Sequence, residues 1–358
     1  MSMSSLKYLP GRVIWRMPFP FRLANAINPS YTLRCVLYHD ISDTTSTFTN
    51  GLGVTVSRKS FEDDIRFLAK YYTPVTLDEA LHPPAIPKRN YRPVLLTFDD
   101  AYASVATEAA PLCQKYGIPA VFFVNSRFVG NQDLALDNLI CHVANTRGMD
   151  AVNKAASEAE KSPVNLNSVN DACGEFLPRV WGAQRETFRQ ALVDATGQSI
   201  KELAEQAGLY MSLHQLRSLA SFNFEIGNHT YSHVYGRNLA GNDFAEEIGR
   251  NKSTLESMTG KPIRTFSAPY GAAIDLPGRL VEYLRQLKHE SAFLVESSVN
   301  NPGTDPMRLL RVSVQVSSNA DLFSELEIMP RLRSIRDALF RRPASASPAA
   351  TQARVAAD

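Results

Sequence analysis

The chain has 358 residues, of which 44% are hydrophobic and 21% charged, and this balance excludes disordered and membrane-spanning proteins. Thirty-eight basic against 36 acidic residues give a net charge of +2, so no general electrostatic field favours nucleic acid as a partner. The four cysteines are scattered without a CxxC pair, which suits a reducing compartment. One large α/β domain, or a barrel with an insertion and tails, is expected.

Residues 1–31 are expected to form an N-terminal extension. Prolines interrupt its apolar run before it could serve as the core of a signal peptide. Residues 8–21 mix aromatic and cationic side chains as interfacial anchors do, and a segment packed on the body of the fold is an equal alternative. No run approaches the roughly 20 apolar residues of a membrane helix. We expect no transmembrane span, a cytoplasmic location and at most peripheral contact with the inner membrane.

Short β-branched or aromatic runs recur through the body of the chain and are predicted to be buried strands. They occupy residues 34–38, 94–98, 120–124, 222–226, 264–266, 291–295 and 309–314. Helical patterns separate many of them, at residues 61–71, 102–115, 212–220, 244–258 and 277–289. Alternation of this kind predicts a mostly parallel sheet or barrel over residues 32–315, with its chemistry at the carboxyl ends of the strands.

An insertion interrupts this rhythm at about residues 131–215. It is rich in Ala, Glu, Asn and Gln, and it is expected to be helical and to shape the choice of substrate. A basic helix is predicted within residues 316–342, followed by a disordered Pro/Ala/Ser tail at 343–358.

The sharpest motif is LLTFDD, an apolar strand that ends in Asp99 and Asp100. Strand side chains alternate between faces, so both carboxylates reach one site only if the chain leaves the strand there. One acid could then bind a metal while its neighbour acts as a base. The alternative is a pair of N-cap residues before the helix that follows.

A second motif, GNHTYSH, places His229 and His233 four residues apart after an apolar run. On a helical turn the two imidazoles could converge on one ion, and Asp100 would complete a three-ligand site with open positions. Thr230 stands where the HExxH zinc proteases carry glutamate. Open positions favour catalysis over a structural role.

Two weaker motifs also follow predicted strands. FSAPYG places Pro269, Tyr270 and Gly271 in a turn whose N–H groups could face an oxyanion, although most such turns are only turns. LYHDISD ends a strand in His39, whose imidazole could protonate a leaving amine. The alternative for His39 is a structural, hydrogen-bonded histidine at a strand end.

In order, TFDD, HTxxH and PYG resemble the motifs of the polysaccharide deacetylase family, carbohydrate esterase family four. The resemblance implies a distorted (β/α) barrel, Asp99 as the base, and Asp100, His229 and His233 as ligands of zinc or of a similar ion, namely Co²⁺, Ni²⁺ or Fe²⁺. It implies hydrolysis of the N-acetyl or other N-acyl group of an amino sugar in a polysaccharide or its precursor.

Two departures from the family pattern stand out. Ser267 replaces the arginine that usually braces the base, and no histidine follows His289 to act as the late acid. The YHD at Tyr38 resembles the permuted arrangement of poly-N-acetylglucosamine deacetylases, which assigns the acid to His39. The missing arginine supports a rival interpretation, a carbohydrate-binding protein that keeps the metal site without turnover. A further rival, an iron oxygenase, leaves Asp99 and His39 unexplained.

Overall fold

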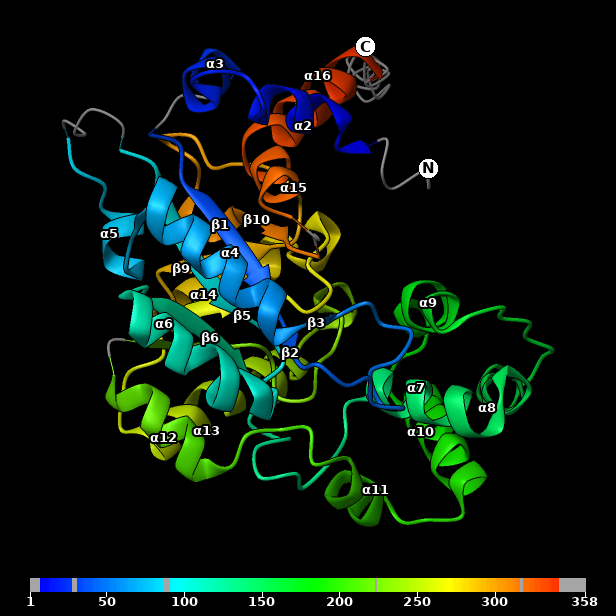
Figure 1. The fold of residues 1–358 in the computed structure, drawn as a ribbon. Coiled ribbons are helices and arrows are strands. Elements are labelled where there is room, and N and C mark those ends of the chain that lie inside the picture. Colours follow the sequence, from blue (N-terminus) through cyan, green and yellow to red (C-terminus); the bar gives the residue numbers. More distant parts are fainter. Residues whose placement is uncertain (1–6, 28–30, 86–90, 223, 316–317, 341–358) are drawn as a thin grey trace, which may run out of the picture.

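Seven parallel strands close into a barrel in the computed structural model, which describes residues 7–27, 31–85, 91–222, 224–315 and 318–340 (Figure 1). The strands are β1 (Arg34–Tyr38), β5 (Pro93–Phe98), β6 (Ala120–Val124), β7 (Glu225–Asn228), β8 (Thr265–Ser267), β9 (Ser291–Leu294) and β10 (Leu309–Ser313). The pairing of β1 with both β10 and β5 closes the ring. The predicted α/β class and distorted (β/α) barrel are therefore confirmed.

Three short strands were not predicted. β4 (Thr73–Pro74) pairs with the start of β5, and β2 (Asp40–Ile41) pairs with β3 (Thr55–Val56) outside the barrel. The strand predicted at residues 222–226 is displaced, since β7 runs over Glu225–Asn228. Phe222 instead caps the preceding helix and is 50% exposed. The strand was predicted to begin at Phe222 because an aromatic residue there extends the apolar run in the sequence.

Strand side chains alternate between the barrel interior and the surrounding helices, as the twofold repeat of a strand requires. Leu95, Phe123 and Phe293 belong to a small apolar cluster inside the ring. Leu96 and Phe122 point the other way, into the larger core under the helices. The odd-numbered residues of β5 therefore lead from this interior cluster to Asp99 at the strand's carboxyl end.

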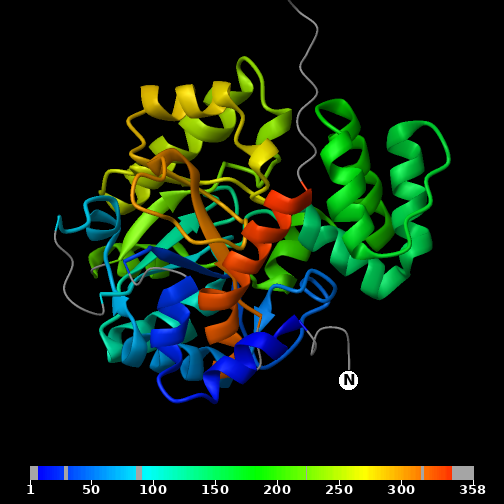
Figure 2. The ribbon, with the colours of Figure 1, turned by 90° about the horizontal axis from the view of Figure 1, so that it is seen from above.

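Helices cover the outside of the barrel (Figures 1 and 2). They are α4 (Arg58–Tyr71), α5 (Leu77–Leu81), α6 (Ala110–Tyr116), α12 (Leu213–Ser221), α13 (Arg250–Thr259) and α14 (Gly278–Gln286). Single π-helical turns, η1 (Val105–Ala109) and η5 (Ala245–Gly249), lead into α6 and α13. Short 3₁₀ turns complete the loops at η4 (Gly236–Asn238), η6 (Ala273–Asp275) and η7 (Pro306–Arg308).

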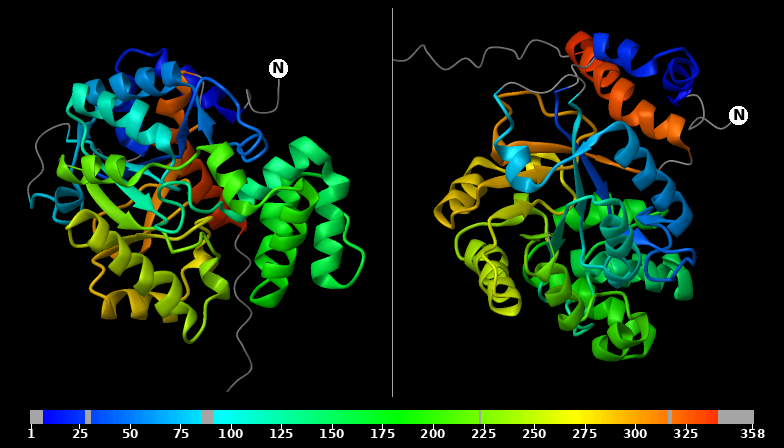
Figure 3. Two further views of the ribbon diagram at one scale, coloured as in Figure 1. Left: turned by 90° about the horizontal axis from the view of Figure 1, so that it is seen from below. Right: turned by 60° about the vertical axis from the view of Figure 1, so that its left-hand side comes forward.

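The segment between β6 and β7 forms a helical lobe beside the barrel, green in Figures 1 and 3. It contains α7 (Leu136–Arg147), α8 (Met149–Glu160), α9 (Val169–Asp171), η2 (Ala172–Phe176), η3 (Leu177–Arg179), α10 (Ala183–Thr196) and α11 (Ile200–Ala207). The lobe has an apolar core of its own. Asn138 fastens it to the barrel, because its side-chain amide bonds the hydroxyls of Tyr102 and Tyr210.

The two ends of the chain pack together on the barrel. α2 (Leu9–Trp15) and α3 (Pro20–Ile27) lie against α15 (Asn319–Phe323) and η8 (Ser324–Ile328), which lead into α16 (Met329–Phe340), as Figure 3 shows. Arg12 forms a two-pronged ion pair with Asp321 at 2.5 and 2.8 Å. A Cβ at Gly11 would collide with Ser324, so glycine lets α2 approach closely. The predicted tail at 343–358 lies outside the described residues.

Candidate active site

The carboxyl ends of the barrel strands meet at one end of the ring. The register aligns Tyr38 with Phe98, and Phe98 with Phe122, so the residues that follow these strands emerge at the same level. The next pair aligns Val124 with Asn228, the residue before His229. Motifs far apart in the sequence are thereby brought together, as parallel barrels require.

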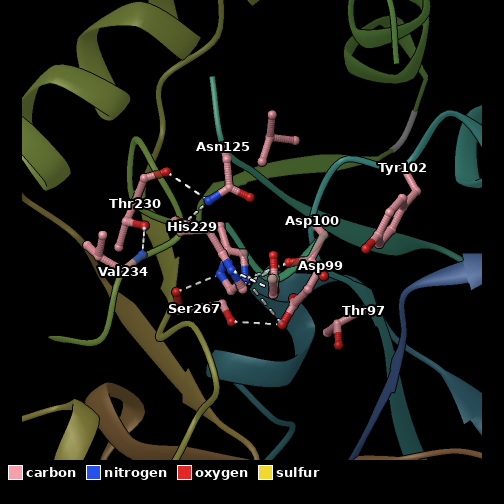
Figure 4. Close-up of polar contacts among 12 residues, drawn as sticks. Thr97, Asp99, Asp100, Tyr102, Asn125, His229, Thr230, Val234 and Ser267 are labelled. Carbon is pink, nitrogen blue, oxygen red and sulfur yellow. Dashed lines mark hydrogen bonds and ion pairs between the residues drawn. The ribbon is translucent and has the colours of Figure 1, made fainter. Parts of the chain in front are cut away.

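Asp99 and Asp100 reach the same site because the chain leaves the strand after Phe98. Asp100 and Ala101 both have positive φ, 69° and 58°. This left-handed step turns the second carboxylate back beside the first (Figure 4). Neither carboxylate accepts a bond from a following helical N–H among the described residues, so the alternative of an N-cap pair is wrong.

His229 and His233 lie on a loop and not on the helical turn that their spacing suggested. Thr230 and His233 take positive φ values of 62° and 53°, which fold the loop tightly. The side-chain amide of Asn125, on the neighbouring strand end, donates to the carbonyls of His229 and Thr230 (Figure 4). The loop therefore depends on a residue about 100 positions away for its shape.

Asp100, His229 and His233 form a cradle for a cation. One oxygen of Asp100 lies 3.2 Å from Nε2 of each histidine, and the three ligand atoms lie within 4.8 Å of one another. That oxygen is buried without a hydrogen-bond partner. An unsatisfied carboxylate oxygen facing two imidazole nitrogens fits the ligand set of a divalent ion with open positions.

The other ring nitrogens of the two histidines differ in their surroundings: Nδ1 of His229 is hydrogen-bonded, whereas Nδ1 of His233 lies within ion-pair distance of a carboxylate without an aligned hydrogen bond. Nδ1 of His229 bonds the carbonyl oxygen of Ser267 at 2.9 Å, and Nδ1 of His233 lies 3.2 Å from Asp137. Burial lowers the pKa of His233, but the adjacent Asp137 and Asp100 carboxylates outweigh it and raise the pKa to about 10. The direction of this shift reflects the two carboxylates that gather around His233, and the same negative charge would favour a bound cation. Asp137, on α7, was not predicted.

Arg311 braces Asp99. Its guanidinium, fully buried on the inward face of β10, donates to the two carboxylate oxygens at 2.7 and 2.8 Å. It also donates to the hydroxyl of Ser267 at 2.7 Å, and that hydroxyl bonds Asp99 at 3.2 Å. Burial would raise the pKa of Asp99, but the charge of Arg311 and these bonds hold it below its usual value. Asp99 is therefore an ionised carboxylate available as a base.

His39 lines the same cleft as the two carboxylates, directly after β1. Its ring makes no hydrogen bond within the described part of the chain, and this argues against a structural role. Burial lowers its pKa although Asp100 and Asp99 oppose the shift. A less basic imidazole is a stronger acid once protonated. The adjacent Asp40 is held by Thr55 and Ser104 and so fixes the backbone on which His39 sits.

The PYG turn contributes one residue to the cleft. Tyr270 has a φ of 62° and its ring stacks on Tyr235 at 3.7 Å between centroids. Its N–H donates no hydrogen bond among the described residues and is free for an oxyanion. Gly271 has a φ of 72°, and a Cβ there would collide with Val295. Pro269 and Gly271 therefore shape the turn and do not line the cleft.

The cleft has a volume of about 390 Å³ and lies between barrel and lobe. Asn170, Cys173 and Gly174 of the lobe line one side, and Leu52 to Val54 lie on the β2–β3 connection. A cleft of this size accommodates a sugar unit with its acyl group. The left-handed residues Asp100, His233 and Tyr270 all line it, and clustered backbone strain is typical of functional sites.

Comparisons with known proteins agree with this geometry. A family model described as polysaccharide deacetylase matches residues 87–168 and 171–292, more than half of the chain. No match was found among curated proteins. The structure resembles IcaB from Ammonifex degensii at 21% identity and a TM-score of 0.51, covering 83% of this chain and 97% of IcaB. It also resembles the Streptococcus pyogenes deacetylase PplD, solved with acetate, at 14% identity and a TM-score of 0.55, covering 83% and 99%. These likenesses show a shared fold.

Proposed function

The chain belongs to the polysaccharide deacetylase family, and on this premise we propose that it hydrolyses the N-acetyl, or another N-acyl, group of an amino sugar in a glycan or glycan precursor. One observation carries the proposal: a three-ligand cation cradle lies beside an ionised Asp99 that Arg311 braces. A metal site alone would not need that second carboxylate. A precursor of a surface polysaccharide is the substrate class that we favour.

Asp100, His229 and His233 would hold the ion, for which we propose Zn²⁺. A divalent ion bound there would supply Lewis acidity that acidifies a water molecule and polarises the amide carbonyl. Asp99 takes the proton of the attacking water, because it is ionised and its two oxygens are fixed by Arg311. Arg311 cannot itself give up a proton, so it orients the base without competing for it.

The remaining residues act on the substrate. The N–H of Tyr270 stabilises the negative charge that develops on the carbonyl oxygen. His39 protonates the nitrogen as the C–N bond breaks, releasing the carboxylic acid and a free amino sugar. The wall formed by Asn170, Cys173 and Gly174 contacts the glycan beyond the reacting sugar.

The rival proposal is a binding protein without turnover. Its main support was the absent arginine at Ser267, and Arg311 now provides the corresponding brace from another strand. An iron oxygenase remains the weakest candidate, since the Arg311–Asp99 pair has no part in its chemistry. The expected cytoplasmic location stays a prediction. In the described ranges no helix combines the length and apolar character needed to cross a bilayer.

Acetate release from chitooligosaccharides tests the proposal. Asp99→Asn should retain bound metal and lose activity by about 10²- to 10⁴-fold, whereas Asp100→Asn should lose the metal as well. Asp43→Asn, a remote carboxylate that accepts a backbone bond from Arg58, is the matched control and should behave as wild type. Full turnover by Asp99→Asn would refute its role as base. Saturable oligosaccharide binding without acetate release in metal-loaded protein would favour the binding-protein alternative.

A further inference from the structure

The segment formed by the two N-terminal helices and their connection carries half of the exposed large apolar side chains of the described residues. Leu9, Val13, Met17, Phe19 and Leu23 are each between 42% and 66% exposed. Leu332 and Ile335 on α16, which follows η8, are similarly exposed. The other comparable side chains among those described are Tyr31, Phe222 and Ile274. We call Leu9–Leu23 with Leu332 and Ile335 the apolar face.

Charge on the same segment is entirely positive. The first acidic residue of the chain is Asp40, and five basic residues precede it. Arg16, Arg22 and Arg331 are exposed, and none has an acidic partner in the part of the chain that the structure describes. The guanidinium of Arg22 lies over the ring of Phe19 at 4.8 Å. A cation that covers an aromatic ring in this way can reach a headgroup while the ring enters the acyl layer.

The inner side of the N-terminal segment packs closely on the body of the fold, so the exposure of its outer apolar side chains does not result from loose packing. Trp15 packs in tilted and edge-to-face geometry among Phe67, Tyr71 and Phe323 at centroid distances of 5.3 to 5.6 Å. Arg12 is paired with the buried Asp321. The fold therefore presents the apolar face outward on two anchored helices.

We propose that the apolar face docks the protein peripherally on an anionic lipid bilayer. Apolar side chains interleaved with unpaired cations fit the boundary between acyl chains and anionic headgroups. A second copy of the chain fits worse, because pairing the face with itself would oppose arginine to arginine. Helices of seven and eight residues lie on a bilayer and do not cross it.

Docking in this way leaves the cleft open. The carbonyl of Phe21 accepts a bond from Arg92, directly before β5, whereas Asp99 follows the carboxyl end of the same strand. Six strand residues, about 20 Å, separate the two levels. The membrane would therefore lie at the amino ends of the strands and the glycan would enter from the far side.

Sedimentation of the full chain with vesicles tests the proposal. Vesicles of phosphatidylcholine with about one third phosphatidylglycerol should bind the protein, and pure phosphatidylcholine should bind it far more weakly, because each cation near a charged surface contributes. Replacing Arg16 and Arg22 by Gln should lower the partition coefficient on anionic vesicles roughly 10- to 30-fold. Phe19→Ser should lower it about tenfold, and raised salt should weaken binding by wild type.

Phe222→Ser and Ile274→Ser are the matched controls, since they remove exposed apolar side chains elsewhere, and they should bind as wild type does. Acetate release by every variant reports that the fold is intact. Equal binding to neutral and anionic vesicles, unchanged binding by both surface variants, or no vesicle binding by wild type would overturn the proposal. So would a stable dimer in ultracentrifugation that Phe19→Ser dissociates, because it would assign the apolar face to a second copy.

Discussion

Replacing Arg311 by Met tests whether this residue keeps Asp99 ionised. The substitution preserves side-chain length and removes both charge-assisted bonds, leaving a buried carboxylate without its cation. Breaking a buried pair from one side costs about 3–5 kcal/mol. With about 2.1 cal/mol/K of unfolding entropy per residue, this cost lowers Tm by roughly 4–7 °C.

The pH dependence of kcat and of Tm tests the role of Arg311 more directly than the loss of stability does. In the wild type the depressed pKa of Asp99 contributes stability above the unfolded-state pKa, and this stability is lost as pH falls through the folded-state pKa. Without Arg311, burial dominates and raises the pKa of Asp99. The acid limb of kcat should therefore move to higher pH, and the difference in Tm from wild type should be smaller at about pH 4.5 than at about pH 7.

Arg34→Met is the matched control, because Arg34 and Glu327 form another fully buried ion pair, on the neighbouring strand β1 but directed toward η8 and not toward the cleft. It should lower Tm comparably and leave the pH profile of kcat unchanged. Arg311→Lys keeps the positive charge and loses the planar guanidinium that donates two bonds to Asp99. The acid limb of its kcat profile should therefore lie between those of wild type and Arg311→Met. If Arg311→Met keeps the wild-type acid limb, the brace does not control ionisation of the base.

The remaining predictions concern the ion, the acid and the lobe. Dialysis against a strong chelator should abolish acetate release and zinc or cobalt should restore it; activity in verified metal-free protein would contradict the cradle. His39→Ala should lower kcat by about 10²- to 10⁴-fold at unchanged metal content. His289→Ala should keep near-normal kcat, since that ring is buried beside Leu284 and outside the cleft; similar losses in both variants would remove His39 from the mechanism. Asp137→Asn should weaken zinc binding by about 10- to 100-fold in titrations, and unchanged affinity would show that Asp137 does not support His233.

The barrel and the cleft motifs could be predicted because both have local sequence signatures. Apolar runs that end abruptly in Asp99 or His39 indicate strand ends, and parallel strands gather those ends at one rim. The loop of His229 and His233 could not be predicted, because its shape depends on positive φ values and on Asn125.

Arg311 and Asp137 were not predicted to be site residues, for two different reasons. A lone cation in the buried run of β10 must have a partner, so the sequence does signal that Arg311 is unusual. Its partner is set by barrel closure, which no local pattern encodes. Asp137 resembles any acid in the first turn of a helix and carries no distinguishing mark.

The position of Asp137 also bears on the expectation that the insertion shapes the choice of substrate. Removing the whole segment would remove the carboxylate beside His233, so substrate preference and metal binding would change together. A deletion that keeps α7 and replaces the loop containing Asn170 and Cys173 separates them. Altered oligosaccharide preference at unchanged metal affinity is then the expected outcome.

In the proposed function, the lobe that contains α7 thus contributes to binding of both the ion and the glycan. α7 places Asp137 against His233, and the lobe that contains it also forms a wall of the cleft. Any glycan that shifts the equilibrium position of α7 alters the affinity for the ion. By linkage the ion then alters the affinity for that glycan by the same factor. For the proposed activity, metal occupancy and glycan preference are accordingly not independent, and an affinity for either ligand has meaning only at a stated concentration of the other.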